Sequence, residues 1–218
     1  MNKFDECTQK YEKLPYMNRA RALYMRDFIK RSDISNILEI GFFHGKSSAY
    51  FAAILEDQGS GHLTTIDMNN AKNRNPNIFD VIQSLNLSHR VTPLFAQRSH
   101  TWELAKLIQM NPRPQFDFCY FDGGHTWDVT GFGFLLVDML LKPGAWIAFD
   151  DMDWTISKSI IHNLDIRPKL EETYKNYSLD EKESTGVRMV YELIGPHLNY
   201  TNFFEEKKFG WGFAQKQK

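Results

Sequence analysis

The chain has 218 residues, of which 42% are hydrophobic and 24% charged, with 26 basic against 27 acidic side chains. This length suits one buried core, and the composition excludes a disordered or fibrous protein. The even mixture of charges argues against a nucleic-acid partner, which would need clustered Lys and Arg. No apolar run reaches the length of a membrane span, and residues 1–13 are polar, so we expect no membrane partner and a cytoplasmic location.

Strands and helices alternate along the first two thirds of the chain. In chain order, the hydrophobic pattern predicts a helix (16–30), a strand (36–40), a helix (47–55), a strand (62–67), a helix (78–87), a strand (90–95), a helix (102–110), a strand (116–122), a helix (129–141) and a strand (146–149). Pro93 favours an edge position for the strand that contains it. The alternation predicts a doubly wound α/β fold with a mainly parallel sheet covered on both faces.

The pattern changes after Asp153. We predict a helix over residues 154–164, a polar stretch over 167–185, and two strand-like runs at 187–194 and 209–215 that form an antiparallel C-terminal hairpin. The sheet then has seven strands. We expect one domain, residues 1–218, divided into an N-terminal helical lid (1–33), a cofactor-binding core (34–153), and a substrate-side insertion with an edge hairpin (154–218).

The turn after the first strand carries the first candidate binding residues. Gly41 and Gly45 stand four residues apart, with the acidic Glu39 before them, which differs from the three-glycine pattern for a pyrophosphate. A carboxylate at this place can bind an ammonium group instead. Asp67 ends the second strand, at the distance where an acidic residue binds ribose hydroxyls. Together these features favour an adenosine ligand with an ammonium group.

Two segments carry a family resemblance. Asn36-Ile-Leu-Glu-Ile-Gly-Phe-Phe-His-Gly-Lys-Ser-Ser48 resembles the first motif of class I S-adenosylmethionine-dependent methyltransferases. Phe118-Cys-Tyr-Phe-Asp-Gly-Gly-His-Thr126 resembles the Asp-Gly-Asp-His-Ser signature of their O-methyltransferase relatives, with Gly124 in place of the second acid. The resemblance implies a Rossmann-like methyltransferase domain, with residues 14–17 in the position of a lid segment.

The resemblance also assigns roles in binding S-adenosylmethionine. It implies that Glu39, Gly41 and Gly45 line the methionine moiety, with Ser47 beside them, and that Asp67 holds the ribose. Gln97 stands at the position of the adenine contact, where the family usually has Gly-Asp-Ser and this chain has Ala96-Gln97-Arg98-Ser99. Asp122 lies at the same edge and is a further cofactor-site residue.

Three carboxylates end two strands that are neighbours in this topology. Asp122 follows the fourth strand, and Asp150 and Asp151 follow the fifth. Without a counter-charge they would repel one another, and a hard divalent cation, Mg²⁺ foremost, would relieve the repulsion. The same positions hold the metal in O-methyltransferases of the catechol and antibiotic-sugar types, which this stretch resembles. His125 is then the candidate general base or a fourth ligand, and Asp122 takes part in catalysis with it.

The leading hypothesis is a Mg²⁺-dependent O-methyltransferase of secondary metabolism that acts on a small hydroxylated molecule such as a sugar or phenol. A second hypothesis keeps the cofactor but uses His125 as a base without metal, so that the activity would resist chelation. A third is a nucleotide-binding oxidoreductase, which the missing third glycine disfavours, or a non-catalytic adenosine-binding module. The expected partner is the small hydroxyl substrate, and a homo-oligomer is compatible with the sequence.

Overall fold

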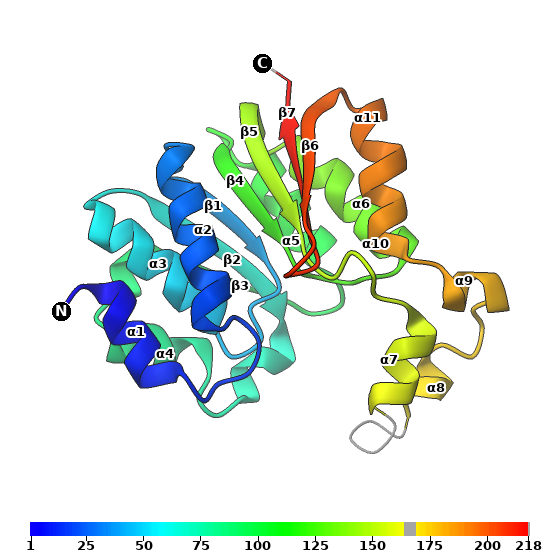
Figure 1. Ribbon diagram of the computed structural model, residues 1–218, viewed down its shortest axis with the longest axis horizontal. Coiled ribbons are helices and arrows are strands. Elements are labelled where there is room, and N and C mark those ends of the chain that lie inside the picture. The colour runs from blue at the N-terminus through cyan, green and yellow to red at the C-terminus, as the bar shows by residue number, and fades with distance from the viewer. Residues whose placement is uncertain (164–168, 218) are drawn as a thin grey trace.

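The computed structural model describes residues 1–163 and 169–217, which are built around one seven-stranded sheet (Figure 1). Its strands are β1 (Asn36–Ile40), β2 (His62–Met68), β3 (Val91–Ala96), β4 (Phe116–Phe121), β5 (Leu141–Phe149), β6 (Tyr200–Glu206) and β7 (Trp211–Lys216). They lie in the order β3-β2-β1-β4-β5-β7-β6, with β1 to β5 parallel and β7 antiparallel to both of its neighbours. The predicted doubly wound, mainly parallel sheet with a C-terminal hairpin is confirmed.

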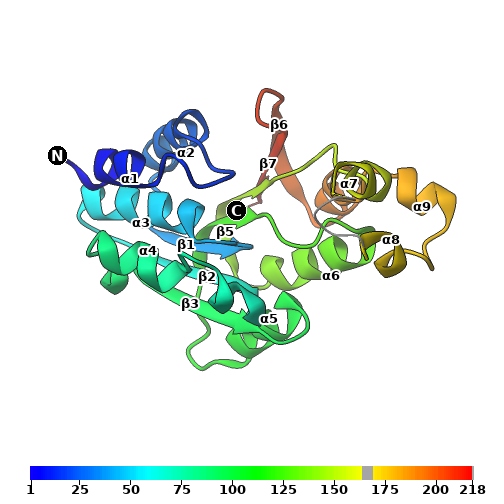
Figure 2. The same ribbon diagram turned by 90° about the horizontal axis from the view of Figure 1, so that it is seen from below.

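Helices cover both faces of the sheet, as Figure 2 shows from a second direction. One face carries α1 (Lys3–Tyr11), α2 (Arg19–Arg31), α3 (Lys46–Gln58) and α4 (Ile78–Ser84), and the other carries α5 (His100–Gln109), α6 (Trp127–Asp138), α10 (Gly186–Met189) and the π-helix η3 (Val190–Ile194). The remaining helices are η1 (Asn69–Asn73), η2 (Ser88–Arg90), α7 (Ile156–Asn163), α8 (Leu170–Thr173), α9 (Leu179–Glu183) and α11 (Gly195–His197). None of the described helices is long and apolar enough to cross a membrane.

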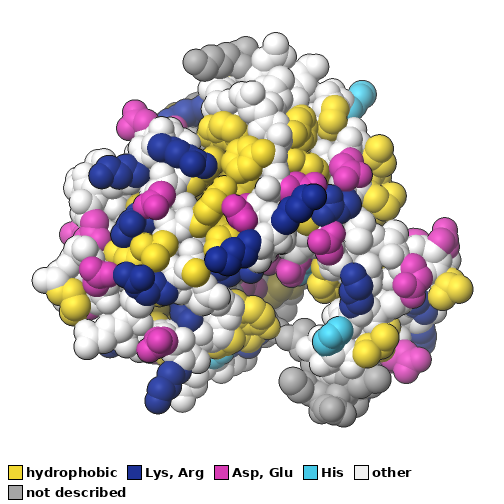
Figure 3. Space-filling model, in the orientation of Figure 1, with side chains coloured by type: hydrophobic (Ala, Val, Ile, Leu, Met, Phe, Trp, Pro, Cys, Tyr) yellow, Lys and Arg dark blue, Asp and Glu magenta, His cyan; other side chains and the backbone are white. Residues whose placement is uncertain are grey.

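The period-two pattern of the central strands produces two cores. Ile37 and Phe118 face the first group of helices, whereas Leu38 and Cys119 face the second. All four side chains are fully buried, as expected for parallel strands that are covered on both sides. β3 is an edge strand and contains Pro93, so the predicted edge position of this strand is confirmed. On the face that Figure 3 shows, basic and acidic side chains are mixed, without a patch of one sign.

The prediction of the first hairpin strand was wrong. Residues 187–194, predicted as a strand, form α10 and η3, and the true partner of β7 is β6, at 200–206. Val187, Val190 and Tyr191 are buried at a spacing of three and four, which suits one face of a helix. This face packs on α6, where a Cβ on Gly131 would lie 3.3 Å from the side chain of Ile194. A burial pattern of this kind can be read as a short strand when only the apolar residues are counted.

The N-terminal part also differs from the prediction. Helix α1 was not predicted, and the predicted helix 16–30 begins only at Arg19, because the side chain of Asn18 caps it by accepting the N–H of Arg21. Residues 12–18 are therefore a connection between two helices. The helix expected over 154–164 is α7, preceded by a short turn; residues 164–168 lie outside the described part of the chain.

Candidate functional site

The site lies at the carboxyl ends of the parallel strands, where this fold class binds its ligands. Gly41 directly follows β1, with φ +89°, and its N–H donates to the carbonyl of Ile66 at 2.8 Å. A Cβ at this position would lie 2.0 Å from the carbonyl oxygen of Asp122. A side chain cannot be accommodated there, so the turn after β1 packs backbone to backbone on the end of β4.

Asp67 holds this turn in place. One carboxylate oxygen, Oδ2, accepts the N–H groups of Phe42 at 2.9 Å and Phe43 at 2.6 Å, and Oδ1 accepts the N–H of Met68 at 2.6 Å. A carboxylate has about four acceptor positions, so Oδ1 keeps one for a further donor. Asp67 thus orders the turn, and its role toward a ribose stays a prediction.

Glu39 lies beneath the turn with a fully buried carboxyl group. Its Oε2 accepts the hydroxyls of Thr65, at 2.6 Å, and Ser48. Burial raises the pKa of this carboxyl to about 7, against the opposing effect of Ser47 and the other two hydroxyls. Oε1 has no hydrogen-bond partner among the described residues, which is costly for a buried acceptor. The carboxyl is therefore equipped to receive a donor from a ligand.

Gly45 and Gln97, also predicted to bind the cofactor, have different surroundings. Gly45 has φ +91° at the start of α3, and a Cβ there would lie 2.8 Å from the side chain of Ile78. Close packing of α4 therefore already accounts for the glycine. Gln97 is exposed in the bend after β3, and its side chain makes no hydrogen bond with the described residues.

The connection over residues 12–18 lies on the same turn. The ammonium of Lys46, at the start of α3, donates to the carbonyls of Glu12 and Leu14, and the ring of Tyr16 meets that of Phe43 edge to face at 5.1 Å. Within the segment expected to form a lid, 1–33, the helices α1 and α2 are packed into the core on one face of the sheet. The connection between them covers the turn, and its movement as a lid stays a prediction.

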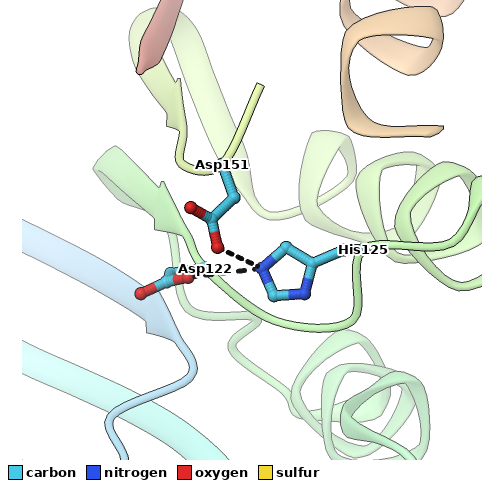
Figure 4. A group of neighbouring side chains, drawn as sticks. All are labelled: Asp122, His125 and Asp151. Carbon is cyan, nitrogen blue, oxygen red and sulfur yellow. Dashed lines mark ion pairs between the residues drawn. The ribbon is translucent and has the colours of Figure 1, made fainter. Parts of the chain in front are cut away.

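Asp122, His125 and Asp151 form a compact group at the ends of β4 and β5 (Figure 4). The Nε2 atom of His125 lies 3.0 Å from Oδ2 of Asp151 and 3.6 Å from Oδ1 of Asp122, and one ligand atom from each residue lies within 4.8 Å of the others. Nε2 is buried, yet it makes no well-directed hydrogen bond to either carboxylate. Two carboxylates and an imidazole in this arrangement can bind a divalent cation.

The charges in this group are coupled. Burial by itself would lower the pKa of His125, but its contacts with Asp122 and Asp151 outweigh burial and raise that pKa to about 9. Burial and the charge of Asp150 raise the pKa of Asp122. Burial would also raise the pKa of Asp151, but the contact with His125 outweighs burial there and lowers that pKa. The contact with Asp151 thus favours the protonated form of His125 and the ionised form of Asp151, whereas the buried Asp122 holds its own proton more tightly.

Asp150, also predicted to bind the metal, lies outside the group of Asp122, His125 and Asp151 and has partners of its own. Its carboxylate accepts the guanidinium of Arg21 at 2.7 and 2.8 Å and the hydroxyl of Tyr120, and it is buried. Because α2 supplies its counter-charge, Asp150 does not need a cation for balance. The structure brings Asp122 and Asp151 together with His125 in its place. The sequence offered no signal for this pair, since Arg21 stands 129 positions earlier.

A pocket of about 270 Å³ opens on the other side of His125. It is lined by His125, Thr126, Trp127, Asp128, Trp154, Ile156, Asn176, Tyr177, Glu181, Ser184 and Gly186. The rings of His125 and Trp154 are stacked, with centroids 5.1 Å apart. A Cβ on Gly186 would lie 2.7 Å from the carbonyl oxygen of His125, so α10 packs closely against this loop. His125 therefore belongs both to the acidic group and to the pocket wall.

The loop after β5 is fixed by Arg188, on α10. Its guanidinium lies 2.8 Å from Asp153 and 2.8 Å from Glu205, on β6. Sequence reasoning did not single out Arg188, because the two partners that tie it to other elements, Asp153 and Glu205, are distant along the chain. Trp127 and Tyr177 were also missed, since isolated aromatic residues carry no motif.

Comparison with known proteins shows the family to which the chain belongs. Residues 38–152, more than half of the chain, match the model of a family described as a methyltransferase domain. No curated protein matches the chain.

Solved structures share the fold. The O-methyltransferase TomG from Streptomyces achromogenes, involved in tomaymycin synthesis and solved with S-adenosylmethionine, is 17% identical, with 100% of this chain and 91% of that chain covered and a TM-score of 0.66. An O-methyltransferase from Bacillus cereus, in complex with S-adenosylhomocysteine, is 22% identical, with 98% and 89% covered and a TM-score of 0.61. The methyltransferase MycE of the mycinamycin biosynthetic pathway, solved with Mg, S-adenosylhomocysteine and mycinamycin VI, is 14% identical, with 99% and 55% covered and a TM-score of 0.60.

The structural similarity shows the fold, and the match to the family model shows the family. Together they confirm the resemblance to class I methyltransferases seen in residues 36–48 and 118–126. The chain belongs to the methyltransferase-domain family and is an enzyme of that class.

Proposed function

We propose that the chain transfers a methyl group from S-adenosylmethionine to a hydroxyl of a small molecule, assisted by a divalent cation, Mg²⁺ foremost. One observation carries this proposal: the group of Asp122, His125 and Asp151 lies between the turn after β1 and the pocket. Gly41 packs on the backbone of Asp122 on one side, and His125 lines the pocket on the other. A donor on the turn and an acceptor in the pocket would meet at this group.

The turn after β1 fits the proposed methyl donor. The unpaired Oε1 of Glu39 can accept an ammonium, and the remaining acceptor position of Asp67 can take a ribose hydroxyl. Gly41, Gly45 and Ser47 lie in or beside the same turn and would line the methionine moiety, and Gln97, exposed in the bend after β3, would contact the adenine. That TomG and the Bacillus cereus enzyme were solved with S-adenosylmethionine and S-adenosylhomocysteine supports this assignment.

The acidic group fits a hard cation. Asp122 and Asp151 would contribute carboxylate oxygens, and His125 would contribute Nε2 once it has lost its proton. When bound, Mg²⁺ would lower the pKa of a coordinated substrate hydroxyl and so favour its ionised form. The Mg in the MycE structure supports this choice of metal.

The protonation of His125 favours this mechanism over one without a metal. Its pKa of about 9 leaves it protonated at neutral pH, so without a cation it is a poor acceptor for a substrate proton. A cation beside Asp122 and Asp151 would compete with His125 for both carboxylates and lower that pKa. His125 could then accept the hydroxyl proton or act as a ligand. The family match gives no support to a nucleotide-binding oxidoreductase.

Methyl transfer to a simple catechol tests the proposal. We expect labelled methyl from S-adenosylmethionine to appear on the catechol with Mg²⁺ present, to fall strongly after exhaustive chelation, and to return when Mg²⁺ is restored. Asp122→Asn should remove this rescue. Turnover that survives chelation would favour His125 as a base without metal, and failure to bind S-adenosylhomocysteine would refute the cofactor assignment.

A further inference from the structure

We propose that the pocket beside His125 selects a hydroxylated ring that carries a cationic amine, and discriminates against carboxylate and phosphate substrates. The inference rests on the proposed function, whose acceptor class it specifies. It follows from the side chains that line the pocket and from where the nearby cations are already bound.

Three aromatic side chains form the walls. Trp154 stacks on His125, which fixes the orientation of its ring next to the acidic group. Trp127 is 43% exposed at the start of α6, and Tyr177 reaches the pocket from the segment between α8 and α9. The faces of such rings bind flat molecules and attract cations through their negative potential.

The charged groups of the lining, apart from His125, are two carboxylates, and no Lys or Arg among the described residues lines the pocket. Asp128 uses Oδ1 to accept the hydroxyl of Thr126 at 2.6 Å, and Glu181 uses Oε2 to accept the N–H of Ser178 at 2.8 Å. The second oxygen of each carboxylate has no hydrogen-bond partner among the described residues. Both groups are therefore held in place with one acceptor oxygen free.

Two cations of neighbouring elements, Arg188 and Lys158, are engaged elsewhere. Arg188 is bound by Asp153 and Glu205, and Lys158 donates to the carbonyl of Asp153 at 3.1 Å while lining a separate cavity. His125, the one positively charged side chain of the lining among the described residues, already contacts Asp122 and Asp151, so an anionic substituent directed toward Asp128 and Glu181 would meet only carboxylates. A cationic substituent would meet two free acceptor oxygens and aromatic faces.

The volume limits the size of the substrate. Small-molecule sites typically enclose about 300–1,000 Å³, so 270 Å³ suits one substituted ring. With its hydroxyl at the group of Asp122, His125 and Asp151, such a ring would lie against Trp154, and an amine on a short arm would reach toward Asp128 and Glu181.

Three probes that share one catechol ring test the charge preference: dopamine (cation), 4-methylcatechol (neutral) and 3,4-dihydroxyphenylacetate (anion). Binding is followed by tryptophan fluorescence with S-adenosylhomocysteine and Mg²⁺ present, and turnover by kcat/KM with S-adenosylmethionine. We expect dopamine to be favoured over the anion by at least about tenfold in both, since two exposed carboxylates each contribute a few-fold to such a difference.

The doubly substituted variant Asp128→Asn/Glu181→Gln should reduce that ratio to about threefold or less, because each amide keeps the accepting oxygen but removes the charge. Glu171→Gln, an exposed change on α8 outside the pocket lining, is the matched control and should leave the ratio unchanged. Equal binding of the three probes, a preference for the anion, or no binding of any probe to the wild-type protein would overturn the proposed substrate class. Binding in the expected order without methylation would support the charge preference and refute the proposed function.

Discussion

Arg21 and Asp150 form an ion pair that joins helix α2 to the end of β5, with one guanidinium nitrogen 2.7 and 2.8 Å from the two carboxylate oxygens. The guanidinium also lies over the ring of Trp211, 4.6 Å from its centroid. Asp150 in turn accepts the N–H of Asp151 at 2.7 Å. The pair therefore orients the backbone of a residue in the candidate metal site without taking part in that site.

Arg21→Ala should lower the free energy of unfolding by about 2–4 kcal/mol, because it leaves the buried carboxylate of Asp150 without its counter-charge. Denaturant unfolding at neutral pH measures the effect. Arg19→Ala is the control, because Arg19 lies on the same helix but is exposed and its ion pair with Asp5 is long, at 3.9 Å. It should lower the free energy of unfolding by less than about 1 kcal/mol. Equal losses in the two variants would contradict the importance of the ion pair.

Neutralising the two adjacent aspartates should separate their roles. Asp151→Asn should weaken Mg²⁺ or Mn²⁺ binding by about 10–100-fold, since it removes a charged ligand from the candidate group. Asp150→Asn should change metal affinity by less than about threefold and mainly lower stability, because Arg21 loses its partner. Titration calorimetry with each metal gives the affinities. The reverse ranking would return Asp150 to the metal site.

The stability of the protein should depend on the ionisation of Glu39. Its pKa is raised to about 7, so the folded chain holds this proton more tightly than the unfolded chain does. The resulting stabilisation is complete below the unfolded pKa of 4.5 and is lost as the pH rises through about 7. Between about pH 5 and pH 8, the free energy of unfolding should fall by about 2–3 kcal/mol more in the wild type than in Glu39→Gln. Parallel curves for the two proteins in denaturant unfolding would show that Glu39 titrates normally.

Asp67→Ala should weaken S-adenosylmethionine binding by at least about tenfold, since it removes an acceptor for the ribose and releases the N–H groups of Phe42 and Phe43. Asp67→Asn keeps one accepting oxygen, so its affinity should fall between those of the alanine variant and the wild type. Calorimetry measures affinity, and circular dichroism verifies that each variant is folded. Unchanged affinity in a folded Asp67→Ala protein would exclude this residue from the cofactor site.

The sequence predicted the parts of the fold that depend on local pattern. β1 and β4 are short, mainly apolar segments that are buried on both faces, and such segments are typical of central parallel strands. Residues 187–194 were misassigned because their conformation is decided by packing against α6, which periodicity over eight residues cannot reveal.

In the candidate site, too, the sequence predicted what depends on local pattern and missed what depends on distant contacts. Asp122 and Asp151 were identified from their places after adjacent strands, and the signature around His125 named the third member of the group. Asp150 was placed with them because adjacent residues at a strand end look equivalent in sequence. The distant Arg21 and the hydroxyl of Tyr120 distinguish it in the structure, and charge pairing across 129 positions has no local signal.

The contact of Gly41 with the carbonyl of Asp122 has a consequence for protein engineering. The contact is possible because Gly41 has no Cβ, and it joins the candidate cofactor turn after β1 to the candidate metal group at the end of β4. None of the described residues between 154 and 186 takes part in it. Changes in the described part of that segment that keep Trp154 against His125 and leave Gly186 in place should therefore alter which acceptor the pocket takes, while the contact of Gly41 with Asp122 is retained. Directed evolution of new specificities would best concentrate its mutations there and keep Gly41 fixed.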